Sequence, residues 1–124
     1  MSQDITADAL NQIMNAKRAG KKELILQRHS KLLISVLAIA KLRGYVKSYK
    51  ADGTKLHVEI GRLNGCKAIK PRFMVIVSEI EKYRIRYLPA KNIGVIIIST
   101  SQGLMTHQTA EEKNIGGSLI AYMY

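Results

Sequence analysis

The feature that most constrains the fold is an uncharged, mostly apolar stretch over residues 32–40. Ser30, a residue type that often caps the start of a helix, precedes it, and Gly44, a residue type that often follows the end of a helix, comes after it. Ser30 can accept a hydrogen bond from a backbone N–H group of the first turn, and Gly44 can adopt the left-handed conformation that closes many helices. The spacing predicts a helix over residues 31–43. Because the stretch has about half the length that a membrane-spanning helix needs, the helix is expected to lie in the core of a globular domain.

A predicted β-hairpin adds a second constraint. Residues 45–50 and 55–60 alternate in character, and Asp52-Gly53 between them tolerates the positive φ angles of a tight turn. The apolar side chains of the second strand are expected to face inward and His57 outward. By the same criteria we expect a helix over residues 6–17, begun by Asp4 or Thr6, and a short strand over residues 24–26. Buried strands are expected over residues 73–77 and 94–100, and a last strand of alternating character over residues 119–124. We also expect a helix that a Ser78–Glu81 capping box begins and Pro89 ends, and a short helix from Thr106 to Lys113.

The order of these elements predicts two small subdomains. It reads αβαββ and then βαββαβ with some short members, which indicates a mixed α/β or α+β fold. Residues 61–70 are rich in loop-forming residues and mark the seam. We therefore expect an N-terminal αβαββ subdomain over residues 1–65 and a β-rich C-terminal subdomain with short helices over residues 66–124.

The charge of the chain is strongly positive and unevenly distributed. The 20 Lys and Arg residues against 9 Asp and Glu residues give a net charge of +11. Residues 17–91 carry a net +14, whereas residues 1–16 carry −2 and residues 92–124 carry −1. Such a surplus favours binding to polyanions, which are nucleic acid or an anionic membrane face. Asp4 and Asp8 precede every basic residue, a polarity unlike that of a targeting peptide, so we expect a cytoplasmic protein.

Patterns typical of enzymes and metal sites are not found. Cys66 is the one cysteine, which excludes an intramolecular disulfide and a cysteine-based zinc cluster. His29, His57 and His107 lack the paired spacing of a zinc site and are expected to be surface or capping residues. The sequence contains neither a nucleophile elbow nor a glycine-rich phosphate loop. We expect no enzymatic activity, no cofactor and no metal.

The most informative local motif is the run Ser-Thr-Ser-Gln-Gly at residues 99–103. Its hydroxyl groups can donate and accept hydrogen bonds, and Gly103 allows a partner to approach the backbone closely. The run could therefore contact bases or ribose hydroxyls, or it could be an ordinary polar β-turn. Gly116-Gly117 could belong to the same kind of site, or could simply end the preceding helix.

Two other groups of residues leave alternatives open. The basic residues at positions 17–31 could contact phosphates, which their excess over local acids favours, or could form a solvated face. The tyrosines could stack on unpaired bases, although residues at such spacings are more often part of a core or of an interface between subdomains. Those tyrosines are Tyr45, Tyr49, Tyr83, Tyr87, Tyr122 and Tyr124.

Motifs along essentially the whole chain resemble one family, the universal small-subunit ribosomal protein number eight in its eukaryotic and archaeal cytosolic form. The longest of them is the stretch from Gly94 to Thr106, which contains the hydroxyl-rich run. The others are Ala7-Asp8-Ala9-Leu10, Ile13, Asn15-Ala16, Gly20-Lys21-Lys22, Ser30-Lys31, Gly44-Tyr45, Gly61-Arg62-Leu63-Asn64, Ile69-Lys70-Pro71-Arg72-Phe73, Gly116-Gly117 and an aromatic C-terminus.

The resemblance implies an α+β protein that binds a helical element in the central domain of small-subunit ribosomal RNA early in assembly and remains in the particle. It implies neighbouring small-subunit ribosomal proteins as further partners, with neither a membrane nor a small-molecule substrate. Together with the basic residues at 17–31, it predicts an RNA-binding set. That set is Asn15, Lys17, Lys21, Ser30, Lys31, Ser99, Thr100, Ser101, Gly103, Gly116 and Gly117.

The chain departs from the family pattern in places. Gln102 stands where bacterial members carry Lys, and Ser118 stands where they usually carry Glu. The stretch from Pro71 to Pro89 is longer than in bacterial members, and the hairpin near Gly53 is shorter than in common eukaryotic ones. Two other functions remain open, namely a regulator that binds RNA outside the ribosome and a small enzyme acting on a phosphorylated substrate.

Overall fold

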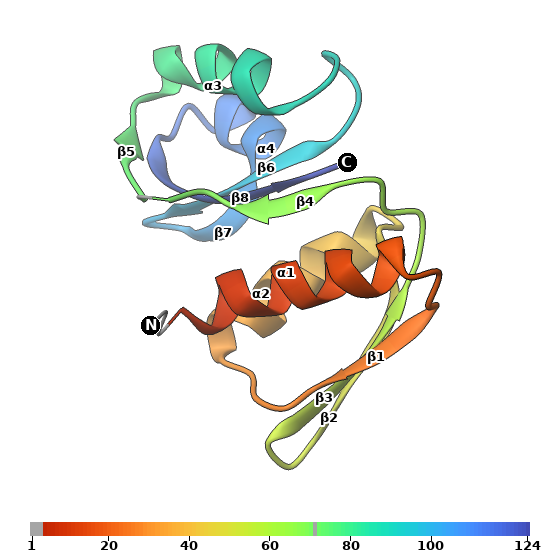
Figure 1. The fold of residues 1–124 in the computed structure, drawn as a ribbon. Helices are drawn as coiled ribbons and strands as arrows, with labels where there is room; N and C mark the ends of the chain where they lie inside the picture. Colours follow the sequence, from red (N-terminus) through yellow and green to blue (C-terminus); the bar gives the residue numbers. More distant parts are fainter. Residues whose placement is uncertain (1–3, 71) are drawn as a thin grey trace. The chain divides into compact units, whose positions relative to one another are not determined.

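The computed structural model describes residues 4–70 and 72–124. Pro71, which the sequence places before a strand, lies outside the described residues. The chain divides into two units, residues 1–67 and 68–124. The elements of the first unit are α1 (Ile5–Arg18), β1 (Glu23–Leu26), α2 (Lys31–Leu42), β2 (Val46–Asp52) and β3 (Lys55–Ile60) (Figure 1).

Both helices of the first unit begin at a side chain that caps the backbone. The Asp4 side chain, and not that of Thr6, accepts from the Ala7 N–H at 3.1 Å. The Ser30 hydroxyl accepts from the Leu33 N–H at 3.2 Å, which confirms the predicted start of α2. Gly44 follows α2 with a φ of 82°.

The three strands of the first unit form an antiparallel sheet in the order β1-β3-β2, and α1 and α2 lie over one face of it (Figure 1). The predicted hairpin is confirmed, with Asp52 opposite Lys55 and Gly53 at a φ of 63°. Leu56 and Val58 are buried while His57 is exposed, as their alternation predicts.

The second unit contains one sheet of five strands. Four of the strands lie in the order β4-β8-β6-β7, and the fifth strand, β5, pairs with β8. The chain passes from one unit to the other within β4. The elements from there on are β4 (Cys66–Ala68), β5 (Met74–Val75), a 3₁₀ turn η1 (Val77–Glu79), α3 (Ile80–Tyr87), β6 (Val95–Thr100), β7 (Gly103–Thr106), α4 (His107–Glu112) and β8 (Gly117–Met123).

The predicted buried strand over residues 73–77 is wrong. The strand is limited to β5, and within it Met74 is exposed and Val75 buried. The chain turns early because the Glu79 carboxylate accepts from the Ile76 N–H at 3.1 Å and starts η1. The capping interaction thus lies two residues earlier than the Ser78–Glu81 box would place it.

Other departures concern β4 and β8. The strand β4 was not expected, because it is short and follows a loop-rich stretch, whereas β7 is the second of the two consecutive strands in the predicted βαββαβ order. The expected alternation in the last strand is also wrong, since Leu119, Ile120 and Ala121 are all buried. This strand is paired on both sides, and its register against β6 shifts between Ile97 and Ile98.

A row of aromatic rings packs against the core of the second unit. Ring centroids are 5.0 Å apart between Phe73 and Tyr83 and 6.5 Å apart between Tyr83 and Tyr87. The row continues to Tyr122 at 5.2 Å from Tyr87 and to Tyr124 at 6.3 Å from Tyr122. All five rings pack against the cluster of buried apolar residues. The four tyrosines of the row are therefore part of the core, which is one of the two alternatives that the sequence left open.

His107 is a core residue and not the surface or capping residue that the sequence predicted. It is 1% exposed, and its Nδ1 atom accepts a hydrogen bond from the Ile96 N–H at 3.1 Å. The two units together confirm the α+β class, with αβαββ order in the first unit and two short helices among the strands of the second.

Candidate RNA-binding surface

The hydroxyl-rich run forms the turn of the hairpin between β6 and β7. Ser99 pairs with Leu104 and Thr100 with Gly103, which leaves Ser101 and Gln102 exposed at the tip. Gly103 has a φ of 107°, a conformation that favours glycine. The tip thus presents one hydroxyl and one amide side chain on a short, hydrogen-bonded turn.

The hydroxyl groups of this turn have different uses. The Thr100 hydroxyl donates to the Gly103 carbonyl oxygen at 2.8 Å and accepts from the Gln102 N–H at 3.1 Å. Within the described residues, the hydroxyls of Ser99 and Ser101 make no hydrogen bond. Thr100 therefore holds the turn, while the two serines can bind a partner.

Gly116 and Gly117 lie against two different strands. A Cβ atom at Gly116 would overlap the Val75 carbonyl oxygen, and one at Gly117 would overlap the Ser99 carbonyl oxygen. The alternative that these glycines end the helix is wrong, because α4 ends before Asn114, which takes the left-handed conformation at a φ of 57°. The glycines instead allow close packing, and Gly117 lies directly beside the hydroxyl-rich turn.

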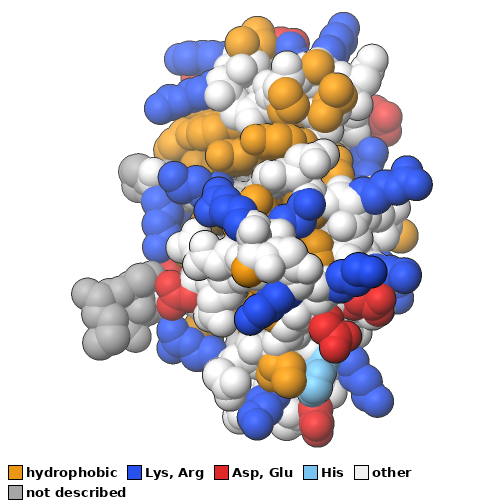
Figure 2. Space-filling view, turned by 45° about the vertical axis from the view of Figure 1, so that its right-hand side comes forward, with side chains coloured by type: hydrophobic (Ala, Val, Ile, Leu, Met, Phe, Trp, Pro, Cys, Tyr) orange, Lys and Arg blue, Asp and Glu red, His pale blue; other side chains and the backbone are white. Residues whose placement is uncertain are grey.

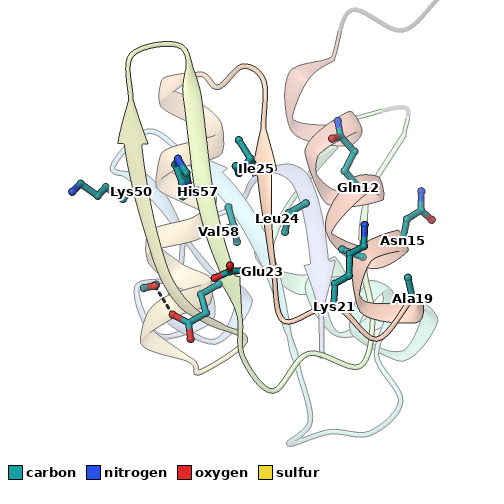
Figure 3. A pocket seen from close by; sticks show the side chains of 13 residues that line it. Gln12, Asn15, Ala19, Lys21, Glu23, Leu24, Ile25, Lys50, His57 and Val58 are labelled. Atoms are coloured by element: carbon teal, nitrogen blue, oxygen red, sulfur yellow. Dashed lines mark hydrogen bonds between the residues drawn. The ribbon is translucent and has the colours of Figure 1, made fainter.

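A groove of about 760 Å³ in the first unit brings together two of the predicted residues, Asn15 and Lys21. Figure 3 shows them on one side of the groove, with Lys50 and His57 across β1 from them. Lys50 and His57 are opposite each other in the β2–β3 register. Sequence reasoning missed this pair as part of the candidate site, although the predicted outward position of His57 in the hairpin was the signal that could have found it.

The other predicted residues of the first unit do not line this groove. Lys17 is exposed in the last turn of α1, and Lys31 is exposed in the first turn of α2. Ser30 is half-buried because it caps α2. Within the first unit the predicted residues therefore occupy a groove and two helix termini, and within the second unit they occupy a hairpin turn and the start of β8.

Most basic side chains project from the surface. In Figure 2, Lys and Arg side chains are spread over the visible face and Asp and Glu side chains occupy few places. Lys17, Lys21 and Lys31 form no ion pair within the part of the chain that the structure describes. Their charges thus remain available to a polyanion.

Other kinds of site find little support in the described residues. Among them no group of three or more His, Cys, Asp or Glu side chains could hold a metal ion. The Cys66 thiol is buried and donates to the Leu10 carbonyl oxygen at 3.7 Å, and burial raises its pKa to about 12. In residues 4–70 and 72–124 no helix has the length and apolar character to cross a membrane.

Comparison with known proteins agrees with the resemblance that the motifs carry. Residues 4–124 match the family model of ribosomal protein S8. The chain is 44% identical to the small ribosomal subunit protein uS8 of Nanoarchaeum equitans over 129 residues, which covers 100% of each chain. It is 42% identical to the small ribosomal subunit protein uS8 of Methanosphaerula palustris over 128 residues, or 98% of each chain. This chain therefore belongs to the ribosomal protein S8 family.

Proposed function

We propose that this protein is a structural constituent of the small ribosomal subunit in the cytoplasm. In this role it binds the central domain of small-subunit ribosomal RNA directly, lies beside other ribosomal proteins, and supports subunit assembly and translation. The observation that carries the proposal is the contact between Gly117 and Ser99, which joins the two most diagnostic motifs of the second unit into one surface.

The two units contribute different kinds of contact. Lys17, Lys21 and Lys31 bind phosphates, displace counterions and hold the protein on RNA without reading its sequence. The turn at Ser101 lies in a segment with a net charge of −1, so it contributes little long-range attraction. Its hydroxyl suits base edges and 2′-hydroxyl groups at an irregular site, because a regular RNA helix exposes few base edges to side chains.

This division of roles between the lysines and Ser101 can be tested by measuring the affinity of three variants for a central-domain RNA transcript and for an unrelated RNA duplex. Ser101→Ala is expected to weaken only the first, by about 1–2 kcal/mol if its hydrogen bonds are lost. Lys21→Gln is expected to weaken both and to flatten the salt dependence. Lys55→Gln is the matched control, because Lys55 is exposed at the tip of the β2–β3 hairpin and outside the predicted set.

Two results would contradict the proposal. Equal losses on both RNAs for Ser101→Ala would show that the turn does not discriminate between RNAs. In sedimentation, the protein is expected to migrate with small subunits and to resist a wash at moderate salt. Recovery in fractions free of ribosomal particles would instead favour the role of a regulator that acts outside the ribosome.

A further inference from the structure

We infer that the outward face of α3, which consists of Lys82, Ile85 and Arg86, binds an acidic segment of a neighbouring protein of the small subunit. The segment places an apolar side chain against Ile85 and carboxylates beside the two cations. The inference rests on the proposed function, which includes protein neighbours, and it assigns one of them a surface outside the predicted RNA-binding set.

The sequence of α3 separates an inner face from an outward face. Ile80 is 1% exposed, and the rings of Tyr83 and Tyr87 pack against the core cluster of the second unit. Positions 82, 85 and 86 are three and four residues apart, so their side chains lie together on the helix. All three are exposed, and Ile85 is 65% exposed. Figure 1 shows α3 at the periphery of the second unit, where this outward face can meet a partner.

The two cations of the outward face keep their charge unbalanced. Neither Lys82 nor Arg86 forms an ion pair within residues 4–70 and 72–124. The carboxylate of Glu81, the one acidic residue of α3, instead pairs with Arg84 at 2.7 Å. Residues 80–91 hold four basic residues against this single acid. The local charge therefore favours a partner that is negatively charged.

Aromatic rings hold both cations close to the helix. The Lys82 ammonium nitrogen lies 5.7 Å from the centroid of the Tyr83 ring, and the Arg86 guanidinium carbon lies 5.5 Å from that of the Tyr87 ring. Such contacts leave N–H groups able to donate to carboxylates, and they reduce the side-chain entropy that binding would cost. Because these two rings belong to the row of aromatic rings that packs against the core, the fold itself positions the cations.

The outward face fits a protein segment better than it fits RNA phosphates. Ile85 lies beside both cations, and burial of an isoleucine stabilises a complex only if the partner supplies apolar surface. A protein segment with an apolar side chain between carboxylates supplies both kinds of contact, whereas a chain of phosphates supplies one. Arginine and tyrosine are also enriched among the residues that contribute most to protein interfaces. Binding of RNA phosphates to the two cations is the competing outcome.

Crosslinking in assembled small subunits tests the inference. With the full chain in the subunit, a photoreactive residue at position 85 is expected to crosslink to another protein, within a peptide in which Asp and Glu exceed Lys and Arg. A photoreactive residue at position 101 is the reference and is expected to crosslink to RNA. A crosslink from position 85 only to RNA, or only to a peptide without an excess of acidic residues, would overturn the inference.

Charge reversal tests the role of the two cations. Lys82→Glu and Arg86→Glu are each expected to lower the yield of the protein crosslink from position 85 about fivefold, which is the upper range for an exposed charge pair. Lys113→Glu is the matched control, because Lys113 is an exposed lysine of the second unit outside α3 and forms no ion pair within the described residues. Equal yields in all three variants would show that the cations do not hold the partner.

The readouts separate failure of the inference from failure of the proposed function. If position 101 crosslinks to RNA while position 85 gives no protein crosslink, the outward face of α3 is not a protein site, although the proposed function stands. If the full chain does not enter small subunits, the proposed function fails and the inference fails with it.

A folding control accompanies these variants. Urea unfolding of each variant is expected to resemble that of the unaltered protein, because the substituted side chains are exposed. If Arg86→Glu proves unstable, Arg86→Gln keeps a polar side chain and removes the charge. A loss of crosslink yield of about twofold is then expected, and an unchanged yield in a folded Arg86→Gln protein would reject the site.

Discussion

Gly117 lies directly against the backbone of Ser99. A Cβ atom at position 117 would overlap the Ser99 carbonyl oxygen and would lie 2.9 Å from the Ile98 Cγ2 atom. The φ angle of Gly117 is not in the left-handed region, so glycine is needed here for space and not for backbone freedom. A local contact between two strands thus fixes the position from which the hydroxyl-rich turn projects.

Gly117→Ala is expected to destabilise the second unit by about 1–3 kcal/mol, because the added methyl group forces β6 and β8 apart. Urea unfolding followed by circular dichroism measures the change. The affinity for a central-domain RNA should fall in the same variant because Ser99 moves with β6. A variant with unaltered stability would show that the two strands do not pack as closely as described.

Thr100→Val is expected to loosen the turn without a change in side-chain shape. The substitution removes a donor to Gly103 and an acceptor for the Gln102 N–H, and the expected loss of stability is about 1–2 kcal/mol. Hydrogen exchange of the Gln102 amide should become faster. Thr100→Ser keeps the hydroxyl and should restore slow exchange, so fast exchange in Thr100→Ser would contradict this role of the hydroxyl.

The buried thiol of Cys66 makes the first unit sensitive to alkaline pH. Burial raises its pKa from 9.0 to about 12, although the charge of Arg18 opposes the shift. Below pH 9 the thiol is protonated in both the folded and the unfolded chain. As the pH rises from 9 towards 12, the unfolded chain releases this proton and the folded chain does not, so stability is lost.

The loss can be measured against Cys66→Ala, which lacks the titrating group. Between pH 9 and 10.5 the unaltered protein is expected to lose about 1.6 kcal/mol more than this variant, because the limiting slope of about 1.4 kcal/mol for each pH unit is reached only above the pKa of the unfolded thiol. Urea unfolding at both pH values gives the difference. Parallel losses in the two proteins would show that the thiol ionises as readily in the folded state as in the unfolded state.

The Glu81–Arg84 pair is expected to make α3 sensitive to acid. Arg84 donates to the Glu81 carboxylate from Nε at 2.9 Å and from a terminal nitrogen at 2.7 Å. These bonds, with the nearby positive charges, lower the pKa of Glu81 below its usual 4.5. The contribution of the pair is therefore present above that pH and is lost as the pH falls through the lowered pKa.

Thermal unfolding between pH 2 and pH 5 tests the pair. The midpoint is expected to fall more steeply in the unaltered protein than in Glu81→Gln, in which no carboxylate remains to be protonated. Glu112→Gln, at the exposed end of α4, is the matched control and should follow the unaltered protein. A Glu81→Gln protein with the same acid dependence would show that the pair contributes nothing to folding.

Much of the fold follows from local rules that the sequence displays. Ser30 and Gly44 bracket α2, and Asp52-Gly53 forms the hairpin turn, because caps and turns depend on residues close together in the chain. The strand predicted over residues 73–77 failed because a side chain three positions ahead, Glu79, accepts from the Ile76 N–H and turns the backbone. The apolar character of Met74 and Ile76 gave no sign of this.

The candidate site was less predictable, because its geometry depends on strands that are distant in sequence. The motifs themselves pointed to Ser99 and Gly117, but only the pairing of β6 with β8 shows that they touch. The position of Ser118 opposite Ser99 likewise depends on the register of these two strands and could not be read from spacing. The engagement of the Thr100 hydroxyl within the turn was equally hidden, since it depends on hairpin geometry.

The position of β8 in its sheet has a consequence for how the protein forms during translation. This strand pairs with β4, β5 and β6, yet it follows all of them in the chain. The three strands of the first sheet and the helices α1 and α2 all lie within residues 5–60. This sheet can therefore form while the rest of the chain is still inside the ribosome that makes it. The second unit must wait for its joining strand, and until then the sides of β4 and β6 that pair with β8 lack their backbone hydrogen-bond partners.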